Sequence, residues 1–81
     1  MSKKTGTKQK VPYTYLEVEM IARDYDEQVP LAVIAENVND DFHGGKPVRT
    51  VNSIKYVVYR INNDDEWMKR LEEEWLAGLE V

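Results

Sequence analysis

The chain has 81 residues, of which 11 are Lys or Arg and 15 are Asp or Glu, and its formal net charge is -4. This length accommodates one small domain with a single core and excludes two independent domains. The absence of cysteine excludes a disulfide framework, so we expect a fold that rests on apolar packing in a reducing, intracellular compartment. No apolar run approaches the roughly 18–20 residues that span a bilayer, so we expect no membrane contact and no secretion.

The charges alternate in sign along the chain. Residues 1–12 hold four lysines and no acid, and residues 45–61 hold four cations and no acid. Residues 13–44 and 62–81 are strongly acidic. A partner senses the local field within about 8–10 Å at physiological salt, so this pattern is more informative than the net charge.

The first 12 residues are polar and basic without periodicity, and we expect a flexible basic arm. The first helix is predicted at about 15–27. Thr14 and Glu17 have the spacing of a capping box, in which each side chain bonds the other residue's backbone N–H. Apolar residues then recur at steps of three and four, as in a helix.

A second helix is predicted at about 30–43. Pro30 suits its first turn because the missing N–H would be unpaired there. An apolar face follows at helical spacing, formed by Leu31, Ile34, Ala35, Val38 and Phe42. Gly44 and Gly45 provide the stop signal, since glycine adopts the left-handed conformation that closes helices.

A third helix is predicted at about 50–62, capped by Thr50. Its β-branched residues would also permit a strand by propensity. The adjacent pair Val57 and Val58 breaks the alternation of a strand, so a helix is favoured. The expected buried stripe consists of Val51, Ile54, Val58 and Ile61.

A fourth, amphipathic helix is predicted within residues 63–81. Asn62 or Asn63 is expected to cap it, and the acids at 64–66 suit its first turn because the helix dipole favours negative charge there. Its apolar stripe consists of Trp67, Met68, Leu71, Trp75 and Leu79. The chain is therefore expected to be all-α.

The segment Arg49-Thr50-Val51-Asn52-Ser53-Ile54-Lys55 resembles the start of the recognition helix in Myb/SANT-like, homeodomain-like helix-turn-helix domains. Those helices typically open with R-T-x-N-x-[IV]-K. Tyr13, Leu31 and Val58 stand where the family has its three tryptophans, and Tyr56 stands where it often has a base-reading Asn. The resemblance implies a three-helix helix-turn-helix domain over residues 13–62, with residues 63–81 packed on it or used for association.

The resemblance further implies a small DNA-binding protein that reads the major groove of double-stranded DNA with the third helix. Such a protein would regulate transcription or act as an accessory factor, and it would be cytoplasmic or nucleoid-associated. Its size and acidity suit a bacterial or phage regulator. Lys and Asn can read base edges, and hydroxyls can reach phosphates. The candidate DNA-binding residues are Lys46, Arg49, Thr50, Asn52, Ser53, Lys55, Tyr56, Tyr59 and Arg60.

Structural explanations compete with these roles. The basic face of the third helix could be solvated without a ligand, and Tyr56 and Tyr59 could pack against neighbours. Trp67 and Trp75 lie eight residues apart, so they could pack the fourth helix on the core or anchor a partner. The alternative function is a small acidic interaction module, an adaptor or an inhibitor of a nucleic-acid-handling protein, with a protein partner or a second copy on the last helix.

An enzyme is the least favoured class. His43 is the single histidine, and no set of nucleophile, base and orienting residue is apparent. The carboxylate pairs at 40–41 and 64–65 lack the spacing of a calcium loop. We therefore expect no catalytic residues, no metal and no cofactor.

Overall fold

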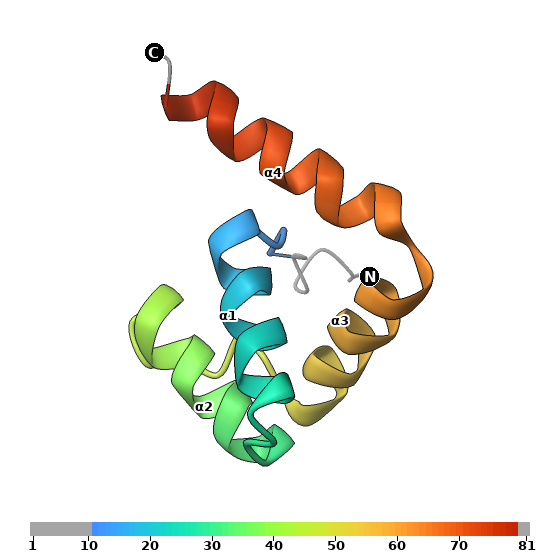
Figure 1. Ribbon diagram of the computed structural model, residues 1–81. Coiled ribbons are helices and arrows are strands. Elements are labelled where there is room, and N and C mark those ends of the chain that lie inside the picture. Colours follow the sequence, from blue (N-terminus) through green and yellow to red (C-terminus); the bar gives the residue numbers. More distant parts are fainter. Residues whose placement is uncertain (1–10, 80–81) are drawn as a thin grey trace, which may run out of the picture.

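The computed structural model describes residues 11–79, so the basic arm predicted at the start of the chain lies almost wholly outside the described residues. Four helices follow one another: α1 Tyr15–Asp26, α2 Leu31–Phe42, α3 Val51–Asn63 and α4 Asp65–Leu79 (Figure 1). The described part contains no strand. The predicted all-α class and the four predicted helices are confirmed.

The start of α1 departs from the predicted capping box. The Thr14 hydroxyl accepts a hydrogen bond from the Glu17 N–H at 3.4 Å, as expected of an N-cap. The Glu17 side chain does not return to the backbone of Thr14, because it is buried against a different element. The reciprocal half of the box is therefore missing.

Pro30 is the N-cap residue of α2, whereas the sequence predicted it inside the first helical turn. Its carbonyl accepts the first backbone bonds of that helix.

The segment between α2 and α3 runs over residues 43–50. Gly44 and Gly45 both have positive φ, at 64° and 81°, as the predicted helix stop requires. The Gly45 N–H donates to the Asn39 carbonyl at 2.8 Å, so the chain reverses directly after α2.

A complete capping box starts α3. The Ser53 N–H donates to the Thr50 hydroxyl at 3.3 Å, and the Thr50 N–H donates to the Ser53 hydroxyl at 3.2 Å. The predicted buried stripe of α3 is partly wrong, because Val57 and not Val58 is fully buried beside Ile54. Compared with the predicted stripe, the buried side of α3 is shifted toward Val57, and Val58 lies half-buried at the edge of the core.

The N-cap predicted for α4 is also wrong. The Trp67 N–H donates to an Asp64 carboxylate oxygen at 3.2 Å, so Asp64 caps the helix instead of Asn62 or Asn63. The N–H of Asp64 donates to the Arg60 carbonyl at the end of α3. One residue therefore ends α3 and begins α4.

Three helices pack pairwise around the core, and α4 packs across α1 and α3 but not on α2 within the described residues. Fully buried aliphatic side chains from α1, α2 and α3 form the centre, and Trp67 extends it under α4 at 9% exposure. The last turn of α4 extends beyond this body (Figure 1). The start of α4 is therefore held by the core, and the end of α4 is far more exposed.

Replacing Trp67 by Ala is expected to lower the free energy of unfolding by about 3–5 kcal/mol, because it empties a buried aromatic site between α4 and the core. The matched change Leu76→Ala, at a side chain 46% exposed on the same helix, should cost less than about 0.5 kcal/mol. Urea unfolding followed by circular dichroism measures both. Equal losses would contradict the described position of α4.

Candidate nucleic-acid interface

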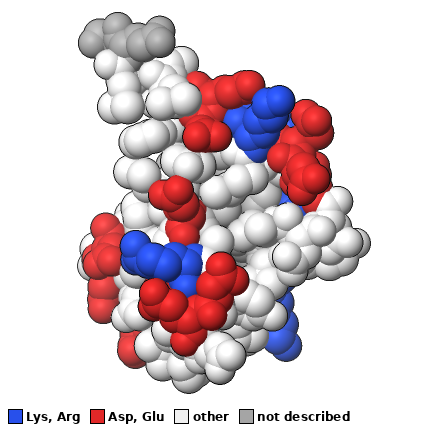
Figure 2. All heavy atoms as spheres, viewed as in Figure 1, with Lys and Arg blue, Asp and Glu red and all other residues white. Residues whose placement is uncertain are grey.

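Among the described helices, α3 is the one without an acidic residue, and the acid-free stretch extends over residues 42–63. The helices α1, α2 and α4 each carry several carboxylates. In Figure 2 carboxylates lie over α1, over α2 and along α4, with Lys and Arg side chains among them on α1 and α4, and the visible surface over α3 carries none. The acid-free block of the sequence therefore becomes a surface of α3 without carboxylates.

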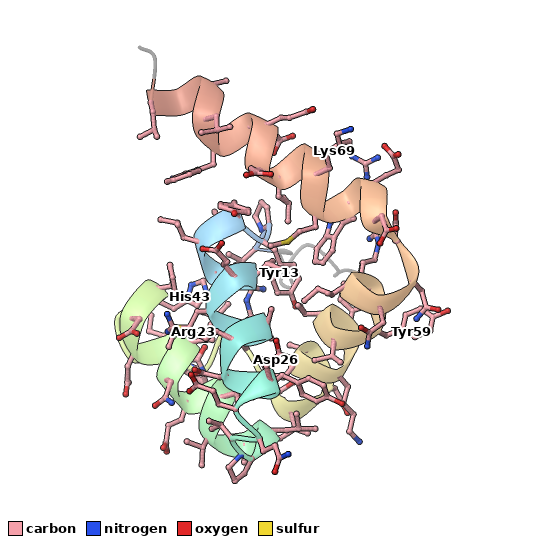
Figure 3. All side chains as sticks on the ribbon, in the orientation of Figure 1. Tyr13, Arg23, Asp26, His43, Tyr59 and Lys69 are labelled. Atoms are coloured by element: carbon pink, nitrogen blue, oxygen red, sulfur yellow. The ribbon has the colours of Figure 1, made fainter. Side chains whose placement is uncertain are left out.

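The exposed side of α3 presents four of the predicted DNA-binding residues: Asn52, Lys55, Tyr56 and Tyr59. Their steps of three, one and three place them on one face of the helix. Tyr59 is 65% exposed and points away from the bundle (Figure 3). We name this surface the α3 face and define it by these four residues.

Lys46 lies exposed in the segment that leads to α3. Its N–H donates to the His43 carbonyl at 3.1 Å, and the Val48 N–H donates to the Lys46 carbonyl at 2.8 Å. The backbone of Lys46 is therefore fixed by local hydrogen bonds, while its ammonium group faces solvent.

Arg49 is not on the surface, which corrects its assignment as a DNA-contacting residue. It is 6% exposed, and its Nε and one terminal nitrogen both donate to the Glu17 carboxylate, the latter at 3.0 Å. Further bonds run to the carbonyls of Val11 and Pro12, at 3.0 and 3.2 Å. The guanidinium carbon also lies 3.8 Å from the centre of the Tyr13 ring. With these partners in place Arg49 cannot reach a phosphate.

The same cluster fixes the start of α3 to α2. The Asn39 side-chain amide accepts from the Arg49 N–H at 2.8 Å and donates to the Arg49 carbonyl at 2.9 Å. His43 Nε2 lies 3.0 Å from Glu17 Oε2, the carboxylate oxygen that also accepts from Arg49 Nε. We name Glu17, Asn39, His43 and Arg49 the polar hub.

Two opposing effects act on the pKa of Glu17. Burial raises it, because desolvation disfavours the carboxylate. Hydrogen bonds and charge from Arg49 and His43 act the other way and prevail, so the pKa of Glu17 is lower than its ordinary value. The carboxylate is therefore charged at neutral pH despite its burial.

The remaining predicted residues serve the fold in part. The hydroxyls of Thr50 and Ser53 bond to each other's backbone in the capping box. Arg60 donates to Asp64 at 3.0 Å and to the Tyr56 hydroxyl at 2.6 Å, and its guanidinium lies 4.9 Å from the Trp67 ring centre. Arg60 thus ties α3 to α4, and its charge is balanced by Asp64.

Beside the α3 face lies an open groove of about 720 Å³, between the segment before α1, the start of α3 and α4. The rings of Tyr13, Tyr56 and Trp67 contact one another along it, with centres 6.0–6.2 Å apart. Burial raises the pKa of Tyr13, and the neighbouring Arg49 charge only partly offsets this. Lining residues are Val11, Pro12, Tyr13, Val48, Arg49, Asn52, Ser53, Tyr56, Trp67, Leu71 and Glu74.

Sequence reasoning missed the polar hub, although one signal was available. Glu17 and Asp24 lie four residues before and three after Ile21, so helical spacing places both on the buried side of α1. A buried carboxylate needs a cation or several donors, which points to an arginine elsewhere in the chain. The spacing did not indicate which one.

Over residues 11–79, no group of three or more potential ligands is arranged to hold a metal ion. No helix in this part is long and apolar enough to cross a membrane. Comparison with protein-family models, with curated proteins and with solved structures finds no match to this chain.

Replacing Arg49 by Met should destabilise the fold by about 3–5 kcal/mol, because it leaves the Glu17 carboxylate buried without its cation. Lys46→Met, three residues away and exposed, should change the free energy of unfolding by less than about 0.5 kcal/mol. The double variant Glu17→Gln/Arg49→Met should lose less unfolding free energy than the sum of the losses in the two single variants. Additive losses in urea unfolding would show that the two side chains do not interact.

The stability should fall with acid in a manner that depends on Glu17. Because its pKa is lower in the folded state, the folded protein binds this proton less readily than the unfolded chain does. The stabilisation is complete above the ordinary value of 4.5 and is lost as the pH falls through the lower folded pKa. Urea midpoints between about pH 7 and 3 should therefore decline more steeply for the wild type than for Glu17→Gln. Glu36→Gln, at an exposed position on α2, is the control and should keep the wild-type slope.

Proposed function

We propose that this chain is a small DNA-binding protein of the helix-turn-helix type, a transcriptional or accessory regulator whose α3 enters the major groove. The observation that carries the proposal is the acid-free, exposed α3 face on a molecule whose other described helices all carry carboxylates. A polyanion approaching from this side meets no acidic residue of α3. Among the described helices, α3 therefore has the surface that best suits DNA. It is also the helix whose start resembles a recognition helix.

The residues of the α3 face suit contacts to a duplex. An α-helix fits the major groove, where Lys can donate to guanine and Asn can pair with adenine. Lys55 and Asn52 lie one turn apart on the exposed side, with Tyr56 and Tyr59 alongside. The exposed Tyr59 side chain carries a hydroxyl that can donate to a phosphate, and Lys46 adds a second cation next to the helix start.

The polar hub supports the same function indirectly. Arg49 is buried, but its bonds to Glu17 and its backbone bonds to Asn39 hold the start of α3 against α1 and α2. A recognition helix must be presented in one orientation so that its side chains reach base edges. We therefore assign Arg49 a positioning role in place of a contact role.

The test is a fluorescence-anisotropy titration of mixed-sequence duplex DNA at about 50 and 200 mM salt. Lys55→Ala should weaken binding and reduce the slope of log K against log salt by about 0.9 if Lys55 contacts one phosphate. Lys69→Ala removes the same charge from the outer side of α4 (Figure 3) and should leave both quantities near wild type. Tyr59→Ala should weaken binding without the change in slope.

Two outcomes would overturn the proposal. One is the absence of binding at the lower salt concentration. The other is an equal effect of Lys55→Ala and Lys69→Ala, since it would show attraction to overall charge without a defined face. The function would then pass to the acidic interaction module described above.

A further inference from the structure

Arg60 bonds to a residue of the α3 face one turn before it and to the first cap of α4 one turn after it. One terminal nitrogen of its guanidinium donates to the Tyr56 hydroxyl at 2.6 Å, and its Nε donates to the Asp64 carboxylate at 3.0 Å. The guanidinium carbon lies 4.9 Å from the centre of the Trp67 ring, which adds a cation–π contact. Two nitrogens of one planar group are therefore engaged at once, and this fixes the direction of the guanidinium.

The direction of the bond between Arg60 and Tyr56 follows from the chemistry of the guanidinium. Hydrogen bonds to Asp64 and to Tyr56 raise the pKa of Arg60 above its ordinary value. The same bond from Arg60 lowers the pKa of the Asp64 carboxyl. A charged guanidinium carries donors and no acceptor. The Tyr56 oxygen is therefore the acceptor in its bond with Arg60.

The Tyr56 ring is held by neighbouring rings as well. Its centre lies 6.2 Å from those of Tyr13 and Trp67, and it meets the Trp67 ring edge to face. The side chain is nevertheless 45% exposed. Ring packing thus sets the position of the phenolic oxygen, and Arg60 approaches that oxygen from one side. The single phenolic hydrogen must point away from Arg60, because two hydrogens cannot occupy the same side of the oxygen.

This arrangement distinguishes Tyr56 from the rest of the α3 face. Of the side-chain hydrogen bonds within residues 11–79, one involves a side chain of this face, and it is the bond from Arg60 to Tyr56. A hydroxyl ordinarily donates or accepts as its surroundings require. With its oxygen bonded to Arg60, Tyr56 presents a hydrogen that is already oriented. A group oriented before binding loses less conformational entropy when its partner arrives.

We infer that Tyr56 donates its phenolic hydrogen to an acceptor atom of DNA and that Arg60 is the positioning residue that orients this hydrogen. The inference rests on the proposed function, because it concerns the contacts of the α3 face with a duplex. The acceptor is a phosphate oxygen or a base-edge acceptor such as guanine O6 or N7. Arg60 acts through Tyr56 in place of a phosphate contact of its own.

The first measurement is the anisotropy titration of duplex DNA with Tyr56→Phe, which keeps the ring and removes the hydroxyl. Its affinity should fall about three- to tenfold with an unchanged salt slope, because a hydrogen bond is lost and no charge is lost. An equal loss on duplexes of different base composition assigns the acceptor to phosphate, and an unequal loss assigns it to a base edge. An unchanged affinity would overturn the inference.

The second measurement concerns Arg60→Lys, which keeps the charge but removes the planar group that bonds Asp64 and Tyr56 together. The affinity should fall about threefold, and the salt slope should stay the same. In the Tyr56→Phe background the same change should alter the affinity less than about 1.5-fold, because no hydroxyl is left to orient. Tyr59→Phe with Arg60→Lys is the matched control and should show additive losses, since Arg60 bonds to the other tyrosine.

The double variant separates positioning from a structural role. Arg60 also holds the cap of α4, and a loss of affinity that arises there would persist in full without the Tyr56 hydroxyl. Additive losses in Tyr56→Phe/Arg60→Lys would therefore overturn the role of Arg60, and circular dichroism should show that both variants remain helical. Absence of wild-type binding at about 50 mM salt would overturn the proposed function together with this inference. Wild-type binding that Tyr56→Phe does not weaken would overturn the inference alone.

Discussion

The ion pair between Arg49 and Glu17 is the interaction on which the arrangement of the helices depends. It joins α1 to the residue just before the cap of α3, and the same arginine binds the carbonyls of Val11 and Pro12 ahead of α1. Its backbone is held by the amide of Asn39 on α2. Three helices are thus tied at one point, and the apolar core alone would specify their relative positions less sharply.

The pair also explains why the molecule accepts a buried charge. Removing a carboxylate and a guanidinium from water costs several kcal/mol per ion, and attraction offsets this only where hydrogen bonds satisfy the remaining donors and lone pairs. Here the guanidinium donates to two carbonyls and rests on the Tyr13 ring, and the carboxylate gains His43 as a further neighbour. The polar hub is consequently complete, which is the condition for such a cluster to hold a single geometry.

The helices were accessible from the sequence because each presents apolar residues at steps of three and four, and this period depends on local geometry alone. Contacts between residues that are far apart in the sequence could not be predicted from it. Arg49 was predicted as a DNA contact because it opens the segment that resembles a recognition helix, and only the folded chain brings Glu17 to it. The choice of Asp64 over Asn62 or Asn63 as a cap was similarly out of reach, since it depends on where α3 ends. Of the candidate site, exposed residues such as Asn52, Lys55 and Tyr59 could be anticipated from the helical period.

The single residue between α3 and α4 has a mechanical consequence. Asp64 ends one helix through its N–H and caps the next through its carboxylate, while Arg60 holds that carboxylate from one turn earlier. The angle between the two helix axes is then governed mainly by one pair of backbone torsions, at φ -145° and ψ 83°. Because α4 is 15 residues long, a few degrees of difference in these torsions would displace its last turns much more than its first. The contact between the Trp75 and Tyr15 rings is therefore a second constraint, at the other end of α4, on the direction that Asp64 sets.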